Sequence, residues 1–223
     1  MQLNIRDVSR LLKVSENKVY EWITDDGLPA QRINSHYYFN KAELLEWATL
    51  HKIDMSIEIF CDDDHAGAGD GLAEALQAGG IFYNVPGDDK PAVLRSVVER
   101  MPLPDGFDSE LLLDLMLARE SHGTTAVGDG IAIPHPRTPI IAPLDRPTMT
   151  LCFLSHPVPF GSADNQPVHT IFALLAPHIK SHLNLLARTA FMIRQPEFRN
   201  LIIKRAQPQV IIDQVRRLDA VPA

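Results

Sequence analysis

The apolar residues of the first fifty positions recur at helical spacing. One face of a first short helix carries Ile5, Val8, Leu11 and Leu12. Ser15 follows a turn and can cap a second helix over residues 16–24, because its hydroxyl can accept a backbone N–H that has no partner within the helix. The pattern places Val19, Trp22 and Ile23 on the inner face of that helix. An extended pair around residues 34–35 then leads to a third helix from Lys41.

Beyond Leu72, short apolar runs alternate with amphipathic helices. Strands are predicted at 81–85, 130–133, 148–154 and 169–177, and helices at 89–101, 108–121, 180–193, 196–206 and 208–218. The runs at 148–154 and 169–177 are almost wholly apolar, so they are expected at the centre of a sheet. Buried strands flanked by helices indicate an α/β layered domain.

An acidic stretch separates the N-terminal helical pattern from the alternating pattern beyond Leu72. Residues 1–54 hold seven basic and eight acidic side chains, whereas residues 55–71 hold five acids and no base. This small, acidic, Gly-rich stretch is interpreted as a solvated linker, although Asp62, Asp63, Asp64 and His65 could in principle hold a cation. The predicted organisation is an N-terminal domain over 1–54, a linker over 55–71 and a second domain over 72–223.

Composition narrows the class of protein further. The 223 residues are 45% hydrophobic, enough for a real core, and the net charge of −7 disfavours non-specific nucleic-acid binding by the whole chain. Cys61 and Cys152 form no CxxC pair, as suits a reducing compartment. No apolar run has membrane-spanning length and no signal peptide opens the chain, so a cytoplasmic location is expected.

The N-terminal pattern of helix, turn, helix and β-wing is typical of DNA-reading domains. The stretch "LNIRDVSRLLKVSENKVYEWITDDGLPAQRINSHYYFNKAELLEWA" resembles the excisionase-type, MerR-like winged helix-turn-helix family. That resemblance implies DNA contacts from the second helix and the wing, at Ser15, Asn17, Lys18, Tyr20, Arg32 and His36. Asp25 and Asp26 depart from the family's usual basic turn and oppose phosphate binding, so a protein partner or self-association stays open as an alternative.

His135 stands apart among the nine histidines. It lies in the stretch "GDGIAIPHP", where an apolar strand leads into an imidazole held between two prolines that stiffen the backbone. Sites gather at strand ends in α/β folds, and a neutral imidazole is a competent nucleophile. A histidine that merely caps a turn is the alternative on this stretch alone. Histidine spacing does not favour a metal site, and no GxSxG elbow is present.

The longer stretch "LARESHGTTAVGDGIAIPHPR" favours a functional role for His135 over a turn-capping one. Together with "KSHLNLLARTAFMIRQPEF", it resembles enzyme IIA of the fructose/mannitol/nitrogen-regulatory class of the phosphoenolpyruvate-dependent phosphotransferase system. The resemblance covers about residues 72–218 and implies a three-layer domain with a mixed sheet flanked by helices. It also implies that an HPr-type carrier phosphorylates His135 at Nε2, with no cofactor and no metal.

The same resemblance assigns roles to neighbouring residues. Arg119 would neutralise the phosphoryl oxygens and His182 would be the second active-site histidine. Gly123, Thr124 and Thr125 would line the phosphate pocket, and Glu120 is expected to order the loop rather than take part in chemistry. The alternative for Arg119 is a surface ion pair, and for His182 a place on a helix surface.

Two functions follow from this sequence. One is a phosphocarrier that receives a phosphoryl group from an HPr-type protein and hands it to a IIB domain or a regulatory target. The other is a DNA-binding transcriptional regulator whose second domain only senses phosphorylation or binds a protein. Because a helix-turn-helix is fused here and no IIB or IIC segment is, the nitrogen-type regulatory branch is favoured.

Overall fold

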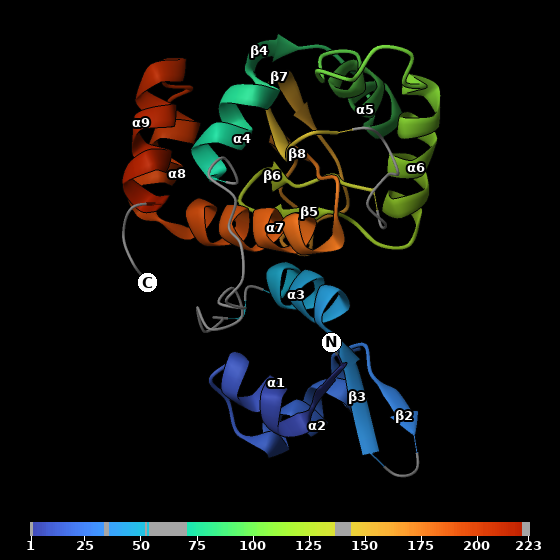
Figure 1. Ribbon diagram of the computed structural model, residues 1–223. Helices are drawn as coiled ribbons and strands as arrows, with labels where there is room; N and C mark the ends of the chain where they lie inside the picture. Colours follow the sequence, from blue (N-terminus) through green and yellow to red (C-terminus); the bar gives the residue numbers. More distant parts are fainter. Residues whose placement is uncertain (1, 34–35, 52, 54–70, 137–143, 220–223) are drawn as a thin grey trace. The chain divides into compact units, whose positions relative to one another are not determined.

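A computed structural model describes residues 2–33, 36–51, 53, 71–136 and 144–219 (Figure 1). They divide into two units, one within residues 1–65 and the other within 66–222. The predicted linker over 55–71, Gly71 apart, lies outside the described residues, and so do Asp62, Asp63, Asp64 and His65. The exact domain boundaries therefore stay a prediction.

The N-terminal unit is a helix-turn-helix followed by a small wing. Its elements are β1 (Gln2–Asn4), α1 (Ile5–Leu11), α2 (Glu16–Asp25), β2 (Gln31–Ile33), β3 (His36–Asn40) and α3 (Lys41–Leu50). The Ser15 side chain accepts the Lys18 backbone N–H and so caps α2, as the sequence predicts. The antiparallel sheet has the order β1-β3-β2.

A small apolar core holds this unit together. Val8, Val19 and Leu44 are fully buried, one from each helix. The rings of Trp22 and Trp47 pack with centroids 5.2 Å apart, joining α2 to α3. The helix-turn-helix is therefore a packed unit and not merely a periodic pattern.

The C-terminal unit contains a five-stranded sheet and six helices among its described residues. Its strands are β4 (Ile81–Val85), β5 (Ala126–Gly128), β6 (Ile131–Ala132), β7 (Thr148–Val158) and β8 (Val168–Leu175). Its helices are α4 (Leu72–Gly79), α5 (Lys90–Val98), α6 (Ser109–Ser121), α7 (Ile179–Arg194), α8 (Pro196–Ile203) and α9 (Pro208–Asp219).

The sheet is mixed, with the order β4-β7-β8-β6-β5. β4 runs parallel to β7, and β6 runs parallel to β8, whereas β7–β8 and β5–β6 are antiparallel. The two almost wholly apolar runs are β7 and β8, and their central position confirms the prediction made from their composition.

Helices cover both faces of this sheet, which gives three layers (Figure 1). On one face, Cys152 of β7 and Ile171 of β8 belong to the same buried cluster as the apolar residues of α5 and α6. The next residues along those strands face the other layer, where Phe172 contacts Phe198 of α8. This alternation is the expected consequence of the strand repeat of two, and it confirms the predicted α/β fold.

Three short elements escaped the sequence pattern: β1, α4 and β5. α4 is an eight-residue helix whose N-cap is Gly71, a residue without a side chain that could cap it. β1 and β5 have three residues each. Within the described part of the chain, no helix is both long enough and apolar enough to cross a bilayer.

Candidate active site

His135 follows β6, one strand in from the edge of the sheet. A turn of three positive-φ residues, Gly128 to Gly130, precedes β6. Gly130 is required there, because a Cβ at this position would collide with the His169 ring. The Leu174 N–H of β8 donates to the Pro134 carbonyl at 3.1 Å. The backbone at His135 is thus fixed both by the preceding proline and by a hydrogen bond to the neighbouring strand.

The imidazole of His135 has a defined tautomer. Its Nδ1 lies 2.7 Å from the Ile133 carbonyl oxygen, which can only accept, so Nδ1 carries the proton. Nε2 then carries the lone pair. His135 is 4% exposed, so its ring is almost completely shielded from water.

His182 lies beside it. It belongs to the first turn of α7, a helix that begins after His178, and it is 6% exposed. The ring centroids of His135 and His182 are 5.1 Å apart, with an interplanar angle of 53°. The alternative of a helix-surface histidine is therefore excluded for His182.

Both imidazoles are held neutral. Burial, followed by the charges of His182 and Arg119, lowers the pKa of His135 to about 3, although its bond to the Ile133 carbonyl acts in the opposite direction. Burial and then the Arg119 charge lower the pKa of His182 to about 4. At neutral pH His135 is thus unprotonated at Nε2, the state that a nucleophile requires.

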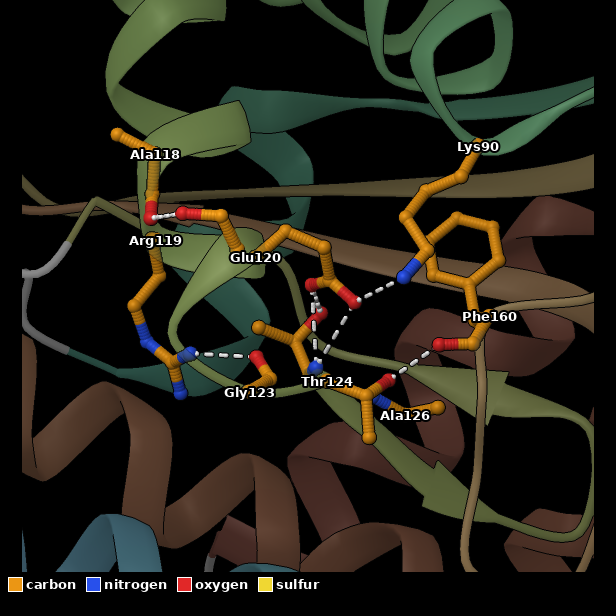
Figure 2. Close-up of polar contacts among 10 residues, drawn as sticks. Lys90, Ala118, Arg119, Glu120, Gly123, Thr124, Ala126 and Phe160 are labelled. Carbon is orange, nitrogen blue, oxygen red and sulfur yellow. Dashed lines mark hydrogen bonds and ion pairs between the residues drawn. The ribbon is translucent and has the colours of Figure 1, made fainter.

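Arg119 supplies positive charge to the same place. It lies near the C-terminal end of α6 and is 6% exposed, so it is not the surface ion pair that was the alternative. Its Nη1 donates to the Gly123 carbonyl at 2.9 Å (Figure 2). A buried guanidinium whose charge reaches both histidines can neutralise an anion bound beside them.

Glu120 organises the loop between α6 and β5, the role that the sequence predicts for it. Its carboxylate accepts the Thr125 N–H at 3.2 and 3.0 Å and the Thr125 hydroxyl at 2.6 Å. The Thr124 hydroxyl donates to the Phe160 carbonyl at 2.7 Å. Both hydroxyl protons are therefore used within the fold, and a phosphate-binding role for Thr124 and Thr125 would need these bonds to exchange. The role predicted for these threonines and Gly123 stays a prediction.

Lys90 is a member of this network that sequence reasoning missed. Its Nζ donates to Glu120 Oε1 at 3.0 Å and lies 5.3 Å from the centroid of the Phe160 ring (Figure 2). It starts α5, thirty positions before its partner, and no local pattern marks that pairing. Among the other described histidines of this unit, His122, His156 and His178 are exposed and His169 is half-buried. Within the described ranges no three His, Cys, Asp or Glu residues gather as a metal site would require.

In the N-terminal unit, all six residues predicted to face DNA are exposed. They lie at the start of α2, along α2 and on the wing strands, at Ser15, Asn17, Lys18, Tyr20, Arg32 and His36. Tyr20 meets Tyr37 edge to face with ring centroids 5.8 Å apart, so α2 and the wing form one surface. Lys18 Nζ lies 2.7 Å from Glu21 Oε2, and that pairing reduces the positive charge available to a phosphate.

Comparison with known families matches both units. The model of the phosphoenolpyruvate-dependent sugar phosphotransferase system, EIIA 2, matches residues 74–217. A helix-turn-helix domain model matches residues 3–49. The sequence resemblances of both units are thereby confirmed.

Individual relatives point the same way. A "Nitrogen regulatory protein" of Pseudomonas aeruginosa is 33% identical over 152 residues, covering 64% of this chain and 95% of the relative. One from Bradyrhizobium diazoefficiens is 35% identical over 112 residues, covering 49% and 71%. The crystal structure of nitrogen regulatory protein IIA-Ntr from Neisseria meningitidis has a TM-score of 0.57 at 23% identity, covering 65% of this chain and 98% of that one. The solved structure bears on the fold alone.

Proposed function

We propose that this chain, because it belongs to the EIIA 2 family of the phosphoenolpyruvate-dependent sugar phosphotransferase system, accepts a phosphoryl group on His135 from an HPr-type carrier protein. Members of this family are phosphotransferase components. The observation that carries the proposal is the Nδ1–H bond from His135 to the Ile133 carbonyl, which directs the lone pair of a neutral imidazole to Nε2.

The transfer itself follows from that geometry. The Nε2 lone pair forms a new N–P bond while the N–P bond of the donor phosphohistidine breaks, and the donor imidazole leaves with the electron pair. The ring of His135 gains positive character and keeps its Nδ1 proton, and the Ile133 carbonyl stabilises that charge. Arg119 neutralises the phosphoryl oxygens, and His182, in contact with the His135 ring, can hydrogen-bond the group.

The protein that next receives or senses the phosphoryl group distinguishes a transport role from a regulatory role. A transport role requires transfer to a IIB domain, whereas a regulatory role requires a target that senses His135. We favour the regulatory role, because a helix-turn-helix domain is fused to this unit and relatives are named nitrogen regulatory proteins. The alternative is a DNA-binding regulator in which the EIIA unit serves as a sensing or protein-binding module.

DNA binding by the N-terminal unit is the second candidate function. One exposed surface joins α2 to the wing through the contact of Tyr20 with Tyr37. A protein partner or self-association remains the competing use of that surface, because Asp25 and Asp26 follow in the same exposed region.

The direct test is phosphorylation of the full chain. Incubation with phosphoenolpyruvate, enzyme I and HPr should add one phosphoryl group, which is lost in acid and kept in base. His135→Ala should abolish the mass increase, whereas His122→Ala, which changes an exposed histidine near the same loop, should not. Full labelling of the His135→Ala variant would overturn the assignment.

A further inference from the structure

We propose that Lys90 is a positioning residue for this phosphoryl transfer, because it fixes the loop that holds both Arg119 and His135. The inference rests on the proposed function for its kinetic consequence and on the hydrogen-bond network for its structural one. Lys90 acts through Glu120, to which its Nζ donates a hydrogen bond at 3.0 Å.

The Lys90–Glu120 pair is anchored on both sides. The Glu120 side chain is 3% exposed and that of Lys90 is 28% exposed, so the carboxylate is removed from water while the ammonium stays partly hydrated. The ammonium also lies over the Phe160 ring, a favourable place for a cation. A buried carboxylate needs such a partner, because an unpaired buried charge is strongly destabilising.

Glu120, held in place by Lys90, in turn fixes the position of Thr125. Its two oxygens accept both the backbone N–H and the hydroxyl of Thr125, which fixes that residue at two points. Three hydrogen bonds and one ion pair thus meet on a single buried carboxylate. Loss of the cation would leave that carboxylate with its hydrogen bonds to Thr125 but without a positive partner, and we expect the loop to move toward water to relieve the cost.

Two routes lead from this loop to the site. In the first, the Thr125 carbonyl accepts the Ile133 N–H at 3.0 Å, and the Ile133 carbonyl accepts Nδ1–H of His135 at 2.7 Å. In the second, the Gly123 carbonyl in the same loop accepts Arg119 Nη1 at 2.9 Å (Figure 2). A shift of this loop would therefore misplace the nucleophile and the charge-neutralising group together.

Steady-state and single-turnover phosphorylation by phospho-HPr should reveal this role. Lys90→Met keeps the length and the apolar stem but removes the charge. We expect the rate constant for transfer to fall about tenfold or more, with KM for phospho-HPr and the final stoichiometry unchanged. Lys90→Arg keeps the cation and should restore most of the rate. Glu120→Gln added to Lys90→Met should cost little further, because the two residues act as a unit.

Arg95→Met is the matched control. Arg95 lies on the same helix, α5, and pairs with Glu110 in an exposed ion pair. Its loss removes one charge from α5 without touching the loop, so transfer should keep the wild-type rate. A Lys90→Met rate equal to that of wild type would overturn the proposal. A raised KM with an unchanged rate constant would overturn it as well, because it would assign Lys90 to docking of the carrier.

A second readout separates this proposal from the proposed function. In ¹⁵N NMR spectra of histidine-labelled full chain, wild-type His135 should show one neutral tautomer with the proton on Nδ1, and Lys90→Met should show a mixture of tautomers. If the wild-type chain takes up no phosphoryl group, the proposed function fails and this spectrum still decides the role of Lys90. An unchanged His135 tautomer in Lys90→Met would then refute the positioning role.

Discussion

Acid should destabilise the C-terminal unit through its two neutral active-site histidines. The pKa is lowered to about 3 in His135 and to about 4 in His182, both mainly by burial. An unfolded imidazole binds its proton near pH 6.5. Between that pH and the folded values, the unfolded chain therefore binds more protons than the folded chain does. The free energy of unfolding is complete above about pH 6.5 and falls as the pH falls toward 4 and 3.

The size of this loss follows from the two pKa values. Well below pH 6.5, each histidine costs about 1.4 kcal/mol per pH unit. Between pH 7 and pH 5 the loss is about 2 kcal/mol for each residue and about 4 kcal/mol for both. The two side chains are 4% and 6% exposed, so solvent screening reduces these figures little.

Urea titration of the full chain at pH 7 and pH 5 can measure the loss, because the two units have separate signals. The two tryptophans of the chain, Trp22 and Trp47, both lie in the N-terminal unit. Tryptophan fluorescence therefore follows that unit, whereas circular dichroism also follows the helices of the other. The two transitions should separate as the pH falls, so each is fitted on its own.

Variants isolate the histidine contribution from that of titrating carboxylates. His182→Gln should reduce the loss between pH 7 and pH 5 by about 2 kcal/mol. His122→Gln, the exposed control, should leave the loss unchanged. His169 also has a pKa lowered by burial, but it is present in all three proteins and cancels. The reasoning is refuted if His182→Gln loses as much stability on acidification as the wild-type chain.

Other consequences of the structure can be measured separately. Arg119→Lys should slow phosphorylation of His135 about a hundredfold without unfolding the chain, because lysine lacks the planar guanidinium; an unchanged single-turnover rate would contradict the charge-neutralising role. Gly79→Ala should lower the free energy of unfolding by about 2 kcal/mol in urea titrations, since its Cβ would collide with the Met149 backbone; a stabilised variant would mean that α4 does not approach β7 so closely. Lys18→Glu should abolish DNA binding in fluorescence-anisotropy titrations at two salt concentrations, and phosphorylated wild-type chain should bind more weakly than unphosphorylated chain. If neither form binds and the N-terminal unit self-associates, its surface serves a protein instead.

Much of the fold was predictable because its longer elements carry strong periodicity. β7 and β8 are apolar along most of their length, and α7 and α9 show clear amphipathic repeats. α4 was missed because it is short and follows an acidic stretch without a side-chain cap. β5 was missed because three residues cannot show an alternating pattern.

Some features of the site were likewise predictable from the sequence, and others depend on tertiary contacts. The two flanking prolines single out His135 as a candidate, and the stretches that resemble the family predict its role together with those of Arg119 and His182. The tautomer of His135 could not be predicted, because it depends on where the Ile133 carbonyl lies in space. Lys90 could not either, because its partner is thirty positions away and the pairing exists only in the folded unit. The engaged hydroxyls of Thr124 and Thr125 are likewise a property of tertiary contacts.

The atom that bears the phosphoryl group tests the central claim most directly. Full chain labelled with ¹⁵N-histidine would be phosphorylated with phosphoenolpyruvate, enzyme I and HPr, and ¹⁵N–³¹P couplings would locate the new bond. The hydrogen bond from Nδ1 to the Ile133 carbonyl predicts phosphorus on Nε2 of His135, with the proton retained on Nδ1. Phosphorus on Nδ1 of His135, or on another histidine, would contradict the account.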